Sequence, residues 1–123
     1  MIDISEQLDA INAAFDSVRI AAFADLSVQL VLADSSKSDI GQEVLDEICI
    51  KAANAFECPA ISPGDSLIDP PIETIIMTDK GILLTLCATE FSPNALIFDC
   101  DYDINLNDIL AVARNTLKKT GAE

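Results

Sequence analysis

The feature of this sequence that most constrains its fold is the order in which its hydrophobic spacings follow one another. Apolar residues recur at helical intervals up to Phe15, then alternate in two runs, Val18 to Ala24 and Val28 to Ala33. Helical spacing returns from about Ile40 to Phe56. Three more strand-like runs and a final helical stripe follow: Ile72 to Thr78, Ile82 to Thr89, Ala95 to Asp99, then Leu106, Ile109, Leu110, Ala113 and Leu117. The order α-β-β-α-β-β-β-α predicts a single α+β domain over residues 1–123, in which one five-stranded antiparallel sheet carries three helices.

The first strand run indicates how the sheet is covered. Successive residues of a strand point to opposite faces. This run divides into two sets: Val18, Ile20, Ala22 and Ala24 on one face, and Arg19, Ala21 and Phe23 on the other. Because neither set is strongly polar, we expect both faces of the sheet to be covered. Asp25-Leu26-Ser27 is expected to join this strand to the next.

Polar and turn-forming residues mark the other connections. The run Asp34 to Asp39 predicts a loop ahead of the second helix, and the proline-rich stretch Glu57 to Pro71 predicts a long surface loop after it. Asp79-Lys80-Gly81 predicts a tight hairpin, because glycine readily adopts the positive backbone angle that such a turn requires. Asn105 or Asn107 is expected to cap the last helix.

Charge and composition restrict the partners of the chain. It carries 21 acidic and 7 basic residues, a net charge of -14, and such a chain is repelled by nucleic acids and by anionic membranes. No apolar stretch is long enough to cross a membrane, and the amino terminus lacks the basic and apolar segments of a signal peptide. The cysteines form no CxxC pair and are interpreted as reduced thiols: Cys49, Cys58, Cys87 and Cys100. We therefore expect a cytoplasmic protein with neither a nucleic-acid nor a membrane partner.

The sequence offers little for catalysis. It contains no histidine, so the most common general base is missing, as are Ser-His and Cys-His nucleophile pairs and histidine-ligated zinc. The glycine-rich motifs that bind phosphates are absent as well. The sequence predicts a protein that is not an enzyme and has no cofactor.

One acidic cluster resembles the start of a metal-binding loop. Asp99, Asp101 and Asp103 alternate directly after a strand, as the first ligands of an EF-hand calcium loop do. The sixth loop position, where glycine makes the turn, is Ile104, and the twelfth, where a glutamate binds, is Leu110. We interpret the cluster as an acidic turn that favours the start of the last helix, and predict no metal site. A cation held by these aspartates is the alternative.

Three features of the sequence together resemble one known family. They are the element order, the Asp79-Lys80-Gly81 hairpin, and the strand Ala95-Leu96-Ile97-Phe98-Asp99 with the asparagine-containing helix start that follows it. This is the Roadblock family of dynein-light-chain-like domains, and the resemblance extends from Ile4 to about Lys119. It implies a Roadblock/profilin-like fold without catalytic residues. It also implies a homodimer or heterodimer that serves as a platform for a small Ras-like GTPase.

The resemblance implies where such a dimer would form. The second helices of two chains would pack together, and the edge strands Ile72 to Met77 would pair across the two-fold axis. The residues expected at this interface are Val44, Ile48, Ile72, Thr74 and Ile76. The strand run supports this independently, because a β-prone, weakly charged edge tends to recruit another strand. We predict a homodimer.

The polar face of the second helix is the predicted partner surface. It consists of Gln42, Glu43, Asp46, Glu47 and Lys51. Glu47 and Lys51 form a favourable pair four positions apart. We expect this face to contact the GTPase because it is acidic, exposed and close to the expected two-fold axis.

Two other binding functions are alternatives. Type III secretion-type chaperones are also small, acidic and dimeric, but they typically place three strands between their first two helices. Only two strands fit between Phe15 and Ile40. A PAS/profilin-like small-molecule sensor would enclose a ligand between the sheet and the second helix, and such a pocket usually needs inward-pointing polar groups. The almost wholly aliphatic stripes of this chain favour a packed core instead.

Overall fold

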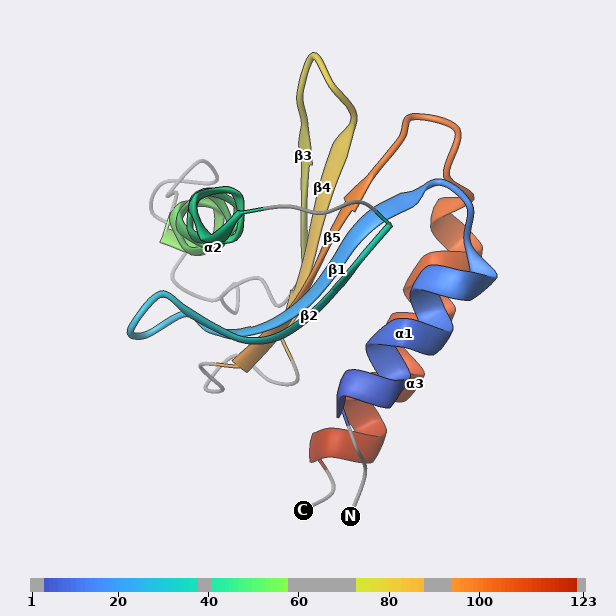
Figure 1. The fold of residues 1–123 in the computed structure, drawn as a ribbon, viewed down its shortest axis with the longest axis horizontal. Helices are drawn as coiled ribbons and strands as arrows, with labels where there is room; N and C mark the ends of the chain where they lie inside the picture. Colours follow the sequence, from blue (N-terminus) through green and yellow to red (C-terminus); the bar gives the residue numbers. More distant parts are fainter. Residues whose placement is uncertain (1–3, 38–40, 58–72, 88–93, 122–123) are drawn as a thin grey trace, which may run out of the picture.

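The computed structural model describes residues 4–37, 41–57, 73–87 and 94–121 (Figure 1). Its helices are α1 (Ile4–Ala14), α2 (Gln42–Glu57) and α3 (Leu106–Gly121). Its strands are β1 (Val18–Asp25), β2 (Leu30–Ser36), β3 (Glu73–Met77), β4 (Ile82–Cys87) and β5 (Asn94–Cys100). The strands form one antiparallel sheet in the spatial order β2-β1-β5-β4-β3, so β2 and β3 are its edges. The predicted order of elements and fold class are confirmed.

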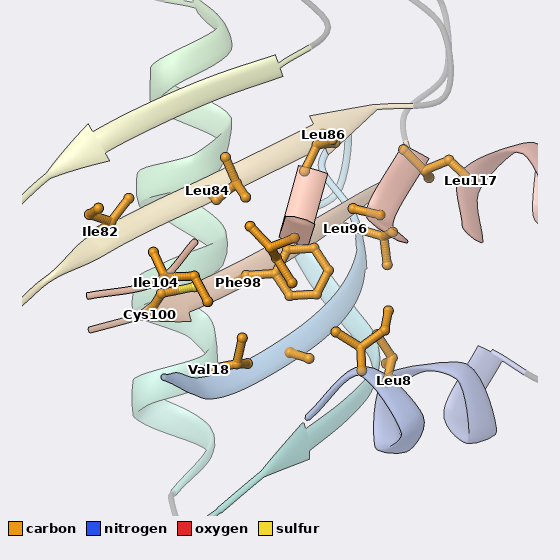
Figure 2. Close-up of a cluster of buried hydrophobic side chains, with 14 residues drawn as sticks. Leu8, Val18, Ile82, Leu84, Leu86, Leu96, Phe98, Cys100, Ile104 and Leu117 are labelled. Atoms are coloured by element: carbon orange, nitrogen blue, oxygen red, sulfur yellow. The ribbon is translucent and has the colours of Figure 1, made fainter. Parts of the chain in front are cut away.

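The helices cover the sheet from two sides. In Figure 1, α1 and α3 lie together on one face and α2 lies on the other. The core beneath α1 and α3 is built around the fully buried Phe98 and Leu8, as Figure 2 shows. A smaller core beneath α2 contains Leu45, Ile48 and Ile97. The expectation that both faces are covered is confirmed.

In the first strand, Val18 lies on a different face of the sheet from the one expected. The register of β1 against β5 shifts between Val18 and Ile20. Val18 therefore packs with Ala21 in the core beneath α1 and α3, whereas Ile20, Ala22 and Ala24 lie beneath α2. Strict alternation assigned Val18 to the wrong face, because an irregularity of this kind breaks the period of two.

The first hairpin is longer than the sequence indicated. The Asp25 carboxylate accepts hydrogen bonds from the Ser27 backbone N–H at 2.9 Å and from the Ser27 hydroxyl at 2.6 Å. Gln29 follows with a φ of 54°, and β2 begins only at Leu30. The strand then continues past Asp34, where we expected a loop. Polar residues are tolerated there because β2 is an edge strand with much of its surface in solvent.

Two predicted local structures are confirmed. The Thr78 N–H donates to the Gly81 carbonyl at 2.8 Å and closes the hairpin between β3 and β4, and Gly81 has a φ of 156°. The Asn105 side-chain oxygen accepts a hydrogen bond from the Asp108 N–H at 3.2 Å, which caps α3. The predicted proline-rich loop lies almost wholly outside the described residues.

Lys37, just after β2, ties the end of α1 to the sheet. Its ammonium group donates to the carbonyls of Phe15 at 2.8 Å and Val18 at 2.6 Å, and to both oxygens of Asn12. The Asn12 amide in turn donates to the Ser35 carbonyl at 2.9 Å. The last carbonyls of a helix have no partner within it, so Lys37 supplies donors where α1 ends.

Candidate interaction surface

β3 is an edge strand whose outer side pairs with no strand in the described part of the chain. Ile75 and Met77 alternate along it and remain 49% and 70% exposed. Thr74 and Ile76 point to the opposite face, and Ile76 packs against the core beneath α2. An unpaired strand with exposed apolar side chains is a surface on which a further strand can add.

α2 carries partly exposed apolar residues besides those of its buried face. Its buried face packs on the sheet and consists of Leu45, Ile48, Cys49, Ala52 and Ala53. Val44 and Ile50 remain 39% and 44% exposed. The sequence analysis assigned Val44 to an interface but overlooked Ile50, which lies outside the buried stripe. The helix therefore has apolar surface that its own sheet does not cover.

The five residues predicted at a dimer interface occupy different environments. Val44 is exposed, and Thr74 and Ile76 are half-buried. Ile48 is only 7% exposed because it packs into the core beneath α2, which leaves it little surface for another chain. Ile72 lies outside the described residues. Exposed Ile75 and Met77, which the sequence analysis did not single out, lie on the same strand as Thr74 and Ile76.

The predicted partner face of α2 is exposed along its length. Gln42, Glu43, Asp46, Glu47 and Lys51 are all solvent-exposed. The Gln42 amide donates to Asp46 at 3.0 Å, and the predicted ion pair joins Lys51 to Glu47 at 2.9 Å. The hydrogen bond from Lys51 is the main cause that lowers the pKa of Glu47 below its ordinary value. Glu47 is therefore ionised at neutral pH.

A cleft of about 310 Å³ lies between α2 and the sheet, beside the turn between β3 and β4. Its apolar lining comes from Ile20, Val44, Ile48 and Leu83. Its polar lining comes from Arg19, Glu47, Lys51, Thr78, Lys80 and Asp99. Of these residues, we expected Glu47 and Lys51 at a partner surface, Val44 and Ile48 at a dimer interface, and Asp99 in a possible cation site. The others lie far apart in the sequence and meet only when β1, β4 and β5 are paired.

Arg19 fixes the acidic turn that follows β5. Its guanidinium contacts Asp99 at 2.8 Å and Asp101 at 3.2 Å. The Ser17 hydroxyl donates to Asp103 at 2.6 Å. All three aspartates of the cluster are thus bonded to the segment that begins β1. Within residues 4–37, 41–57, 73–87 and 94–121, no group of three potential metal ligands is present.

The cysteines of the described segments are free and buried: Cys49, Cys87 and Cys100. Burial raises the pKa of all three thiols, and that of Cys100 reaches about 12. They are therefore protonated at neutral pH and poor nucleophiles. Cys58 lies outside the described residues. Among the helices that the structure describes, none is long and apolar enough to span a membrane.

No family model matches the sequence, and no curated protein matches it. Solved structures, however, share its fold. A Roadblock/LC7 domain from Streptomyces avermitilis superimposes with a TM-score of 0.78 at 12% identity, over 98% of this chain and 97% of that one. The gliding protein MglB from Thermus thermophilus gives a TM-score of 0.69 at 19% identity, over 92% of this chain and 82% of that one. An MglB with a tetrameric arrangement gives 0.67 at 15% identity, over 93% and 82%.

These structures agree with the fold in its main features. The similarity covers nearly the whole chain, so it includes the sheet, the pair α1 and α3 on one face, and α2 on the other. At such low identity the similarity concerns the fold alone. This chain has the fold of the Roadblock/LC7 domains.

Proposed function

We propose that this protein is a non-catalytic dimeric interaction module that binds and regulates a small Ras-like GTPase. The observation that carries the proposal is the apolar edge of β3, which pairs with no strand among the described residues, beside the exposed side of α2 in a chain with the Roadblock/LC7 fold. The family resemblance in the sequence implies the same role.

The proposed dimer pairs the β3 strands of two chains in antiparallel fashion, so that two five-stranded sheets become one. In a closed two-fold dimer the same edge serves both partners, and no free edge remains at the join. Thr74 and Ile76 would lie beneath the paired α2 helices, whose partly exposed Val44 and Ile50 would provide apolar contact. Ile75 and Met77 would lie on the opposite face of the joined sheet.

The partner surface would be the acidic face of α2, presented twice around the two-fold axis. Three of its five side chains, Glu43, Asp46 and Glu47, are acidic, whereas Gln42 is neutral and only Lys51 is basic. Such a surface suits a partner with basic residues, and electrostatic attraction speeds the encounter of oppositely charged proteins. The MglB structure with a tetrameric arrangement supports assembly into more than one copy for this fold.

The element order also favours this function over the secretion-chaperone alternative. Only β1 and β2 lie between α1 and α2, whereas those chaperones typically place three strands there. The buried thiols and the lack of histidine support a non-catalytic role.

The proposal is tested with the Ras-like GTPases of the source organism, each loaded with GDP or with a non-hydrolysable GTP analogue. We expect the protein to bind at least one of them and the double variant Glu43→Lys/Glu47→Lys to bind it more weakly. Asp9→Lys/Asp16→Lys is the control, because it makes the same charge change at exposed residues of the α1 segment. Equal weakening by both double variants would assign the effect to net charge. Binding to none of the GTPases would contradict the proposal.

A further inference from the structure

Three of the 7 basic side chains of this acidic protein line the cleft between α2 and the sheet. Arg19, Lys51 and Lys80 line it, against Glu47 and Asp99, although the whole chain has 21 acidic and 7 basic residues. We propose that this cleft binds a small organic monocarboxylate with a short aliphatic body. The site goes beyond the proposed GTPase platform and does not require it.

The charges of the cleft leave one cation available. Arg19 is held by Asp99 at 2.8 Å and by Asp101 at 3.2 Å, and Lys51 is held by Glu47 at 2.9 Å. The Lys80 ammonium makes no ion pair with any residue that the structure describes. A carboxylate in the cleft would therefore pair with Lys80, close to the two cations that are already neutralised.

The same charges select a single negative charge on the ligand. Lys80 is the one cation of the lining that has no ion pair among the described residues, and one carboxylate balances it. A doubly charged phosphate would leave an excess negative charge beside Glu47 and Asp99, in an environment where like charges repel. The preference for a monoanion thus follows from the lining and not from a general affinity for anions.

The apolar part of the lining fits an aliphatic body. Ile20, Ile48 and Leu83 are nearly fully buried and form a rigid wall, while Val44 is partly exposed. The volume of about 310 Å³ is near the lower end of the range of roughly 300 to 1,000 Å³ for small-molecule sites. A partner helix, which is about 10 to 12 Å wide with its side chains, does not fit such a space. A short carboxylic acid does.

The β3–β4 turn holds Lys80 at this position. The Thr78 hydroxyl accepts hydrogen bonds from the N–H groups of Lys80 and Gly81 at 3.2 and 3.1 Å. Gly81 lies so close to β5 that an added Cβ would be 2.1 Å from the Cys100 carbonyl oxygen. The backbone on which Lys80 stands is therefore fixed against the sheet, and a ligand need not order the turn when it binds.

The test is a titration of the whole isotope-labelled chain with hexanoate, followed by two-dimensional NMR in the absence of any GTPase. We expect saturable shifts at residues that line the cleft, and much weaker effects from the neutral hexanamide and from inorganic phosphate. Lys80→Gln should weaken hexanoate binding by about fivefold, in the range of one accessible ion pair. Glu47→Gln should strengthen it, because it removes a negative charge and frees Lys51.

Lys118→Gln is the matched control, since it makes the same charge change on α3, which lies on the other face of the sheet. The proposal is overturned if hexanoate causes no saturable shifts, if hexanamide binds equally well, or if Lys118→Gln weakens binding as much as Lys80→Gln. It is also overturned if only acidic peptides bind, because the cleft would then receive a side chain of a partner protein. None of these outcomes depends on whether a GTPase binds.

Discussion

Arg114 on α3 holds Glu73 on β3 through two parallel hydrogen bonds, from Nε to one carboxylate oxygen at 2.6 Å and from Nη2 to the other at 2.7 Å. Glu73 is the first residue of the edge strand. This fork-to-fork contact joins the strand proposed to form the dimer to the helix layer on the face opposite α2. It fixes the end of β3 without covering Ile75 and Met77.

This pair predicts a pH-dependent contribution to stability. The hydrogen bond from Arg114 is the main cause that lowers the pKa of Glu73 below its ordinary value of 4.5. A lowered folded-state pKa stabilises the fold above pH 4.5, and this contribution disappears as the pH falls through the folded-state pKa. We expect Arg114→Gln to destabilise the protein at pH 7 and to have little effect in acid. Urea unfolding at several pH values measures this, and an unchanged difference across pH would contradict it.

Lys37 is expected to be a major determinant of stability. Lys37→Met keeps the aliphatic stem but leaves the carbonyls of Phe15 and Val18 without their donor. The Phe15 carbonyl is exposed and the Val18 carbonyl is part-buried, so water replaces part of what is lost, and the free energy of unfolding should fall by about 1 kcal/mol. Lys51→Met is the control, because its ion pair with Glu47 is exposed. Equal stability of the two variants in urea unfolding would refute the role of Lys37.

Gly81 is expected to tolerate no side chain. A Cβ at this position would lie 2.1 Å from the Cys100 carbonyl oxygen and 2.5 Å from a guanidinium nitrogen of Arg19. Gly81→Ala should therefore destabilise the protein by more than about 2 kcal/mol, since backbone or the Arg19 contact must move. Gly41→Ala is the matched control, because nothing lies within 4 Å of its added Cβ. Thermal unfolding of the two variants should separate them clearly.

Charge at the β3 edge is expected to prevent dimerisation. Ile75→Lys/Met77→Lys replaces two side chains that are half-exposed or more in the single chain, so the fold should survive. Lysines on an edge strand disfavour strand pairing, and in a dimer they would meet the same lysines of the partner. Val28→Lys/Leu30→Lys is the control, because it makes the same change at comparably exposed residues at and just before the start of the other edge strand, β2. Only the first variant should be monomeric by sedimentation velocity.

Sequence patterns were sufficient where the determining contacts are local. The period of apolar residues predicted all eight elements in order, and residues a few positions apart predicted the Gly81 hairpin, the Asn105 cap and the ion pair between Glu47 and Lys51. The hairpin, the cap and the ion pair each depend on a single turn or helix. No distant segment is needed to specify them.

Patterns failed where distant segments decide the outcome. The shift at Val18 depends on how β1 pairs with β5, which begins more than seventy residues later. Strand β2 extends past Asp34 because β1 supplies its hydrogen-bond partners there. The cleft could not be predicted either, since Arg19, Lys80 and Asp99 approach one another only after the sheet has formed. Arg19 alone, a cation in an otherwise apolar strand, was a signal that could have indicated it.

The central claim is that two copies of this chain join through β3 and α2. The most direct test is the mass of the intact protein by light scattering across a wide range of concentrations, followed by the mass of the Ile75→Lys/Met77→Lys variant. We expect twice the chain mass of 13.1 kDa for the intact protein and the mass of a single chain for the variant. A mass of 13.1 kDa for the intact protein at every concentration would contradict it.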